Sequence, residues 1–204
     1  MKRLFFALNA TVPLEKSFAP FLKKIRIGAD QREIAVRWTP PENYHVTVTF
    51  MGETPDENVP ALQKVLSDVC SRFQSFDLKI EDISGFSNEH DARVIYLGVQ
   101  NKKYLNEFKQ ALDTALEEAG LLLHIDERNF VPHLTIGRLR NPRSVKDLIS
   151  PLKRKSFGKV LVNEIVLYES KLQGAFPVYT PIFRAQLTSL PKVDEDESFN
   201  IQGP

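Results

Sequence analysis

The chain has 204 residues, 42% of them hydrophobic and 14 of them phenylalanine, which is enough for a folded core and excludes a disordered chain. Its 27 basic and 26 acidic side chains nearly cancel, which excludes the large positive excess of a protein that covers duplex nucleic acid. The lone Cys70 excludes a disulfide framework, and no signal-peptide pattern or run of ~20 apolar residues is visible, so we expect a cytoplasmic protein that does not enter the membrane.

Apolar periodicity and turn residues predict a chain in which helices and strands are mixed. In chain order, we expect a strand at 3–10, a helix from Pro13 that ends at Gly28, strands at 34–38 and 45–52, a helix at 57–73, strands at 76–86 and 92–99, a helix at 102–119, a strand that begins at His133, a helix at 142–152, and strands at 160–168 and 179–187.

The last segment, 191–204, holds one lysine and four acidic residues and few apolar ones, which predicts an unordered acidic tail. Residues 1–190 are then expected to form one domain. Because the tail holds much of the negative charge, the domain keeps a net formal charge of +4. That mild excess is compatible with an anionic ligand.

Two of the four histidines lie in the same local pattern, His45-Val46-Thr47-Val48 and His133-Leu134-Thr135-Ile136. Side chains alternate along a strand, so the His and Thr of each triplet share a face while the residue between them points to the opposite face. Each triplet is preceded by an Asn-aromatic pair and followed by a helix and a strand. This weak repeat predicts two similar α+β lobes whose His-x-Thr strands meet at a cleft along a pseudo-twofold axis.

The residue types fit a displacement at phosphorus, which needs a base to activate water and an acid to protonate the leaving oxygen. Imidazole changes charge near neutral pH and can play either part. Threonine hydroxyls can donate hydrogen bonds to the nonbridging phosphate oxygens, where negative charge grows. A solvent-exposed or structural role is the alternative for each histidine taken alone, but two copies in matched frames favour a shared site.

These motifs, with several flanking segments, resemble those of the 2H phosphoesterases, and among them the RNA 2′,3′-cyclic phosphodiesterases of bacteria and archaea. The similar segments are Arg3-Leu4-Phe5-Phe6-Ala7, residues 43–52 around the first motif, residues 132–138 around the second, Tyr168-Glu169-Ser170-Lys171-Leu172 and Tyr179-Thr180-Pro181. The resemblance implies an α+β fold of two pseudo-symmetric lobes, each an antiparallel sheet with helices on its outer face and the active cleft between them.

The resemblance also implies a function: hydrolysis of a terminal 2′,3′-cyclic phosphate on RNA ends or nucleotides to a 2′-phosphomonoester, without metal or cofactor. We expect the protein to be a monomer. The resemblance implies His45 as the acid, His133 as the base, and Thr47, Thr135 and Arg138 as phosphate ligands. Arg138 is an odd number of residues from Thr135, so a bulge or its long stem must turn it toward the others. The resemblance further places Phe6 near the nucleobase, and Tyr179 is a second candidate for that contact.

Two alternative functions and one further surface remain open from the sequence. A related phosphodiesterase could act on 2′-5′ linkages or other cyclic nucleotide phosphates, or join RNA ends. A binding module could recognise the same ligands without chemistry. Finally, the basic cluster Lys153-Arg154-Lys155 could touch RNA, although such clusters are usually solvated surface.

Overall fold

The computed structural model describes residues 1–121, 130–174 and 176–189, apart from the side chains of 11–15. The predicted acidic tail at 191–204 lies outside the described residues. Among the described residues, none of the helices combines the length and apolar composition that a membrane crossing requires.

Strands and helices are mixed along the chain. In chain order they are β1 (Lys2–Asn9), α1 (Thr11–Gln31), β2 (Val36–Trp38), η1 (Pro41–Asn43), β3 (His45–Thr54), η2 (Asp56–Asn58), α2 (Val59–Cys70), β4 (Phe76–Phe86), β5 (Ala92–Val99), α3 (Lys102–Glu118), β6 (His133–Arg143), α4 (Lys146–Ile149), η3 (Ser150–Leu152), β7 (Ser156–Val162), β8 (Glu164–Gln173) and β9 (Phe176–Gln186).

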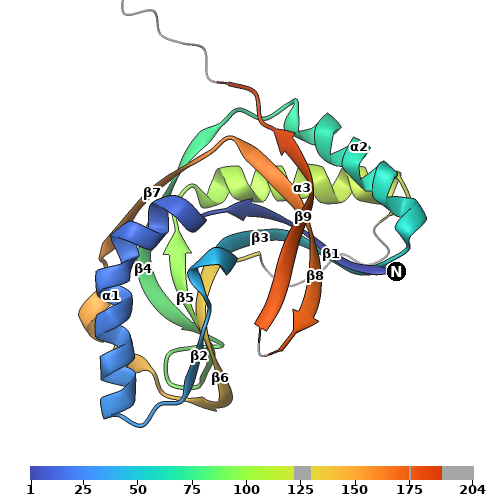
Figure 1. Cartoon of the computed structure of the whole chain (residues 1–204). Coiled ribbons are helices and arrows are strands. Elements are labelled where there is room, and N and C mark those ends of the chain that lie inside the picture. Colours follow the sequence, from blue (N-terminus) through green and yellow to red (C-terminus); the bar gives the residue numbers. More distant parts are fainter. Residues whose placement is uncertain (122–129, 175, 190–204) are drawn as a thin grey trace, which may run out of the picture.

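The strands of the described residues form one curled, antiparallel sheet (Figure 1). Their spatial order is β7-β4-β5-β6-β3-β1-β8-β9, and the short β2 pairs with β6. We call β3, β1, β8 and β9 the first lobe, and β6, β5, β4, β7 and β2 the second lobe. The lobes join where β3 meets β6, so their sheets are continuous. This confirms the predicted α+β fold of two lobes.

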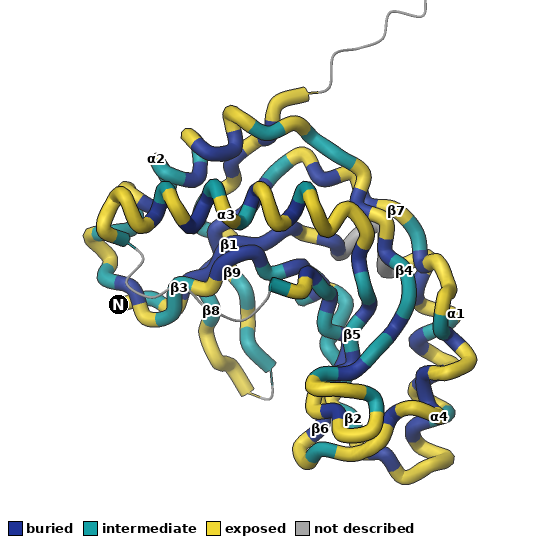
Figure 2. The backbone as a smooth tube through the Cα atoms, turned by 180° about the vertical axis from the view of Figure 1, so that it is seen from behind, coloured by how far each residue is buried: buried dark blue, intermediate teal, exposed yellow. Residues whose placement is uncertain are grey.

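The helices cover the outer, convex side of the sheet, and two of them, α1 and α3, lie on the lobe that they do not directly follow. α1 follows β1 of the first lobe but contacts β7 of the second, whereas α3 follows β5 of the second lobe but contacts β3 of the first. Figure 2 shows the helices with their buried sides toward the sheet. The exchange of these two helices ties the lobes together in addition to the continuous sheet.

The main core lies between the helices and the convex face of the sheet. β1 contributes Leu4, Phe6 and Leu8 to this core, all with 0% exposure. Its other face carries Phe5 and Ala7, which pack in a small separate cluster with Val166 and Tyr168 of β8. β1 is therefore buried on both faces, which explains its continuous apolar run.

The predicted end of the first helix at Gly28 is wrong, because α1 continues to Gln31. Gly28 instead allows close packing: a Cβ atom there would lie 3.1 Å from Leu148 Cδ1 of α4. This glycine marks a helix contact, not a helix end.

Two further predicted elements are wrong in the last third of the chain. The single strand expected at 160–168 is two strands, β7 and β8, which are not paired with each other and lie near opposite ends of the strand order, although only Asn163 separates them in sequence. The helix expected from Pro142 begins only at Lys146, because β6 extends through Pro142 to Arg143. Beyond Arg138 the only described partner of β6 on its β5 side is Ala92, opposite Arg143, so a proline is tolerated there.

Candidate active site

The two His-x-Thr motifs lie side by side at the junction of the lobes. β3 and β6 share one backbone pair, Val46 opposite Leu134, which are the central residues of the two motifs. Both are fully buried. His45, Thr47, His133 and Thr135 therefore share the opposite, concave face, with each His across from the Thr of the other strand. Diagonal positions in such a pair are about 7–8 Å apart, a spacing that suits one phosphate between the two rings.

A bulge follows each motif and changes which side chains reach the concave face. In β6, Thr135 pairs with Tyr96 and Gly137 with Ile95, so Ile136 is the extra residue. In β3, the matching extra residue is Val48, since Thr47 pairs with Ala7 and Thr49 with Phe6. The bulges reset the alternation, so the third residue after each Thr faces the motif side. These residues are Arg138 in β6 and Phe50 in β3.

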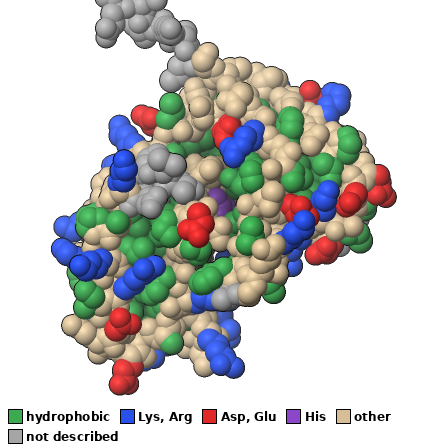
Figure 3. All heavy atoms as spheres, in the orientation of Figure 1, with side chains coloured by type: hydrophobic (Ala, Val, Ile, Leu, Met, Phe, Trp, Pro, Cys, Tyr) green, Lys and Arg blue, Asp and Glu red, His purple; other side chains and the backbone are tan. Residues whose placement is uncertain are grey.

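The concave face holds a pocket of about 530 Å³. Figure 3 shows a histidine side chain in a hollow on this side of the molecule. The lining comes from both lobes and consists of Arg3, Phe5, Arg37, Thr39, Pro40, Asn43, His45, Thr47, Phe50, His133, Thr135, Arg138, Ser170, Leu172, Phe176, Pro177 and Tyr179. Three of these described residues are arginines and none is acidic, so the pocket favours an anion.

His45 is fixed by two hydrogen bonds and two aromatic rings. Its Nδ1 lies 2.7 Å from the carbonyl oxygen of Asn43, which can only accept, so Nδ1 carries the hydrogen. In the neutral ring, Nε2 then accepts from the hydroxyl of Thr47 at 3.1 Å. The rings of Phe5 and Tyr179 lie 5.1 and 5.0 Å from the imidazole. This arrangement leaves Nε2 as the atom that exchanges protons with a ligand.

His133 has the same arrangement in the second lobe. Its Nδ1 donates to the carbonyl oxygen of Val131 at 2.7 Å, two residues before it. The rings of Phe86 and Tyr96, on β4 and β5, lie 4.7 and 5.3 Å from the imidazole. The two histidines thus share the tautomer and the pair of neighbouring aromatic rings, while the contact between Nε2 and a threonine hydroxyl is described for His45.

Burial lowers the pKa of both histidines. For His45 the value falls from 6.5 to about 4, chiefly by desolvation, against the opposing hydrogen bond to Asn43; the positive charges of His133 and Arg138 lower it further. The pKa of His133 is also lowered, by burial and by Arg138, against its bond to Val131. Both rings are therefore neutral at pH 7, and a bound anion would raise both pKa values by offsetting the arginine charge.

The two residues predicted to contact the nucleobase, Phe6 and Tyr179, have different surroundings. Tyr179 lines the pocket, and burial raises its pKa while the nearby Arg138, Arg3 and Arg37 lower it. The prediction for Phe6 is wrong: its side chain has 0% exposure and lies in the main core, while its neighbour Phe5 lines the pocket. Because β1 is apolar on both faces, its sequence gives no sign of which phenylalanine faces the site.

The sequence analysis did not predict several of the residues that line the pocket. Arg37 on β2 pairs with Arg138 across the strands, and its guanidinium lies 5.7 Å above the ring of Phe176 at the β8–β9 hairpin. Arg3 lies 5.0 Å above the exposed ring of Phe50. The one signal available in the sequence is that Phe50 and Arg138 occupy the same position after their motifs.

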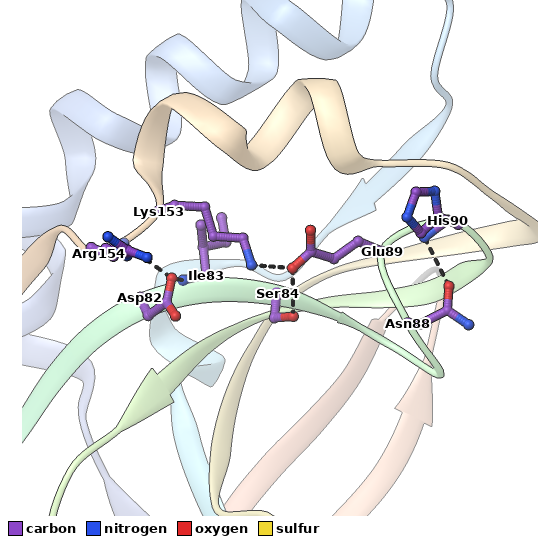
Figure 4. A network of polar contacts seen from close by, with 8 residues as sticks. All are labelled: Asp82, Ile83, Ser84, Asn88, Glu89, His90, Lys153 and Arg154. Atoms are coloured by element: carbon purple, nitrogen blue, oxygen red, sulfur yellow. Dashed lines mark hydrogen bonds and ion pairs between the residues drawn. The ribbon is translucent and has the colours of Figure 1, made fainter.

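The β4–β5 hairpin that carries Phe86 is held in place by a polar network (Figure 4). Glu89 in the hairpin loop accepts from Ser84 and from Lys153. The backbone N–H of Arg154 donates to Asp82 at 3.1 Å. The charge of Lys153 is therefore paired with Glu89 within the protein. This makes Lys153 less available for the contact with RNA that the basic cluster 153–155 suggested.

No cluster of three or more His, Cys, Asp or Glu side chains that could hold a metal ion is found in the part of the chain that the structure describes.

Comparison with known proteins identifies relatives of this chain. A family model described as the 2′-5′ RNA ligase superfamily matches residues 14–174. A curated protein of Methanocaldococcus jannaschii, named RNA 2′,3′-cyclic phosphodiesterase, is 31% identical over 183 residues, which cover 88% of this chain and 98% of the relative. A protein of Methanothermobacter thermautotrophicus with the same name is 29% identical over 172 residues, or 83% of this chain and 92% of the relative.

Solved structures share the fold. The TT0787 protein of Thermus thermophilus has a TM-score of 0.74 at 23% identity, and LigT of Escherichia coli, solved with 3′-AMP, has a TM-score of 0.69 at 23% identity. Each match covers 92% of this chain and 98% of the solved chain. The family match over most of the chain, two His-x-Thr strands in register and this shared architecture lead to one conclusion: the chain belongs to the 2′-5′ RNA ligase superfamily, whose members are 2H phosphoesterases.

Proposed function

We propose that this protein is an RNA 2′,3′-cyclic phosphodiesterase that opens a terminal cyclic phosphate by paired-histidine acid–base catalysis without a metal ion. The observation that carries the proposal is the pairing of two neutral imidazoles, each with its Nδ1 fixed by a carbonyl, across one arginine-lined pocket. The names of the curated relatives support the choice of substrate.

In the proposed reaction, His133 Nε2 takes a proton from water as the water oxygen bonds to phosphorus. The bond between phosphorus and the 3′-oxygen breaks, and His45 Nε2 gives its proton to that oxygen. The product has a 2′-phosphate and a 3′-hydroxyl. Afterwards His133 is charged and His45 neutral, and proton exchange with solvent restores the starting state.

The remaining groups would stabilise the transition state. Thr47 and Thr135 lie on the motif face and would donate to nonbridging oxygens, where negative charge develops. Arg138 would add a charge-assisted pair of hydrogen bonds. Binding of the anionic substrate would also raise the pKa of His45, so this ring would take up from solvent, when the substrate binds, the Nε2 proton that it needs as an acid.

The first test is substitution of each histidine. His45→Ala and His133→Ala should each lower the rate of hydrolysis of a nucleoside 2′,3′-cyclic phosphate by about 10²–10⁴, the usual effect of losing a proton-transfer group. His90→Ala is the matched control, because His90 is an exposed residue of the β4–β5 loop and does not line the pocket. Circular dichroism would check that all three fold. Full activity in both site variants would refute the proposal.

The second test separates the two roles. With a substrate whose 3′-oxygen is replaced by sulfur, the leaving thiolate needs no general acid. His45→Ala should then recover much of the wild-type rate, while His133→Ala should remain slow. The reverse pattern would exchange the assignments.

The third test concerns the metal. Hydrolysis should be unchanged after dialysis against a chelator and on addition of Mg²⁺ or Zn²⁺. Loss of activity with the chelator, restored by one cation, would show that the mechanism is wrong.

A further inference from the structure

The pocket has two different rims. On the first-lobe side the rim consists mainly of apolar side chains, among them Leu172 at 80% exposure, Phe176 and Phe50, together with one arginine, Arg3, which lies over Phe50. On the second-lobe side it consists of the paired Arg37 and Arg138. A nucleotide held by its phosphate at the motifs is therefore flanked by an apolar wall on one side and a cationic strand pair on the other.

The cationic side continues beyond the pocket along β6. Arg140 is two residues after Arg138, and the buried Leu139 between them points into the core, so both arginines leave the same face of the strand. Both are exposed, and neither side chain has an ion pair or hydrogen bond with the residues that the structure describes. The two positions are about 6.8 Å apart along the strand.

An RNA substrate has to leave the pocket in one direction. Its cyclic phosphate is at the 3′ end, so the rest of the chain continues from the 5′ oxygen of the terminal nucleoside as a polyanion. Phosphate groups are attracted to arginines. The second-lobe side carries Arg37 and Arg138 at the pocket and Arg140 next to it, whereas Arg3 is the one arginine among the described lining residues on the first-lobe side. The cationic rim is therefore the exit that the charges favour.

Resting on the proposed function, we propose that β6 is a binding track for the RNA strand: Arg140 binds the phosphodiester on the 5′ side of the terminal nucleotide, and the enzyme prefers oligoribonucleotide ends to mononucleotides. Arg37 and Arg138 begin the track inside the pocket, and Arg140 extends it by one contact outside. The protein needs no broad basic surface for this, in keeping with its small net charge.

The test compares two substrates with the same reactive group, a nucleoside 2′,3′-cyclic monophosphate and a short oligoribonucleotide that ends in the same cyclic phosphate. The wild type should hydrolyse the oligomer with the higher kcat/KM, and this advantage should shrink as NaCl is raised. Arg140→Gln should lower kcat/KM for the oligomer about 3–10-fold through KM and reduce the salt slope by about one. Arg140→Gln should leave kcat/KM for the mononucleotide unchanged.

Arg72→Gln is the matched control, since Arg72 is exposed at the end of α2 and does not line the pocket. Arg72→Gln should change kcat/KM for neither substrate. Arg140→Lys should keep most of the preference for the oligomer. Equal kinetics of the wild type on both substrates, or an equal effect of Arg140→Gln on both, would overturn the binding track.

A binding measurement separates this proposal from the function on which it rests. Fluorescence anisotropy with a labelled oligoribonucleotide that ends in a 2′-phosphate needs no turnover. If neither cyclic substrate is hydrolysed, the proposed function fails, while weaker binding by Arg140→Gln than by Arg72→Gln would still support the track. If both variants bind like the wild type, the track fails whatever the turnover.

Discussion

Each catalytic candidate is a histidine whose Nδ1 is bound to the carbonyl two residues before it and whose ring is covered by two aromatic side chains. The bond fixes the tautomer, and the aromatic rings remove water from most of the imidazole surface. The His and Thr positions could be predicted because each motif is local and its alternation is simple. The aromatic partners could not, because Phe5, Phe86 and Tyr96 come from other strands.

The buried His45 should make the stability of the protein depend on pH. Its pKa is about 4 in the folded chain and 6.5 as its ordinary value, so between these values the unfolded chain binds the extra proton. The free energy of unfolding should therefore fall as the pH drops from 6.5 to 4 and stay constant above 6.5. His45→Gln should remove about 2–3 kcal/mol of this loss, as measured by urea unfolding at pH 4–8.

The variant curve should keep a smaller slope, because the pKa of His133 is lowered in the same direction. Parallel curves for the wild type and His45→Gln would contradict the lowered pKa of His45.

Arg138 should act on both binding and proton transfer. Its guanidinium lines the pocket and lowers the pKa of both histidines. Arg138→Gln should lower kcat/KM for a cyclic phosphate about 10–100-fold, the effect of losing hydrogen bonds to a charged group. It should also move the acidic limb of the pH–rate profile of kcat/KM to higher pH, because both histidine pKa values rise.

Arg138→Lys is the informative comparison. It keeps the charge, so the acidic limb should stay near its wild-type position, although the loss of paired hydrogen bonds should still lower kcat/KM. An unchanged profile in Arg138→Gln would show that its charge does not reach the histidines.

At the scale of the elements, the two bulges decide which side chains make the site. Simple alternation would turn Arg138 and Phe50 away from the histidines, and the extra residues Ile136 and Val48 turn them back. The sequence suggested a bulge for Arg138 only as a requirement of its expected role. A bulge depends on the register of the neighbouring strand, which no local pattern encodes.

Gly137, next to the bulge in β6, allows β2 to pack closely against β6. Gly137 pairs with Trp38, and a Cβ atom there would lie 2.7 Å from Val36 Cγ1 and 3.2 Å from the ring of Trp38. Gly137→Ala should displace β2 and with it Arg37. We expect a loss of about 1–3 kcal/mol in the free energy of unfolding, the usual effect of overpacking, and a higher KM.

A second substitution checks the cause. In the double variant Gly137→Ala, Val36→Ala the nearest clashing methyl is gone, so part of the KM increase should be reversed. If the double variant has the KM of Gly137→Ala, the displacement of β2 by Val36 is not the reason. Coupling between the two sites is expected because they are in contact.

At the scale of the whole molecule, the sequence could predict the two lobes but not how they are joined. The repeat of the motifs is visible in the chain, whereas the exchange of α1 and α3 between lobes and the separation of β7 from β8 depend on distant partners. A continuous sheet and two exchanged helices mean that neither lobe can complete its core alone. We therefore propose that residues 1–190 unfold as one cooperative unit.

A buried polar contact between α3 and β3 of the first lobe tests this proposal. Asp113 of α3 has 6% exposure, accepts from the hydroxyl of Thr49 on β3 at 2.6 Å and pairs with Lys109. Asp113→Ala leaves the largely buried Lys109 without this carboxylate, which should cost about 3 kcal/mol. Asp68→Ala, which removes the exposed pair with Lys64, should cost about 0.5 kcal/mol or less.

If the lobes unfold together, calorimetry of Asp113→Ala should show a single transition with a lower midpoint temperature. Amide hydrogen exchange should become faster in β4 and β5 by as much as in β1 and β3. β4 and β5 belong to the second lobe, which α3 does not cover. An equal effect in these strands therefore requires coupling through the sheet and the exchanged helices. Two transitions, or faster exchange confined to the first lobe, would instead make each lobe a separate folding unit. The pocket would then lie between two independently stable bodies, and its His-His spacing would depend on their motion.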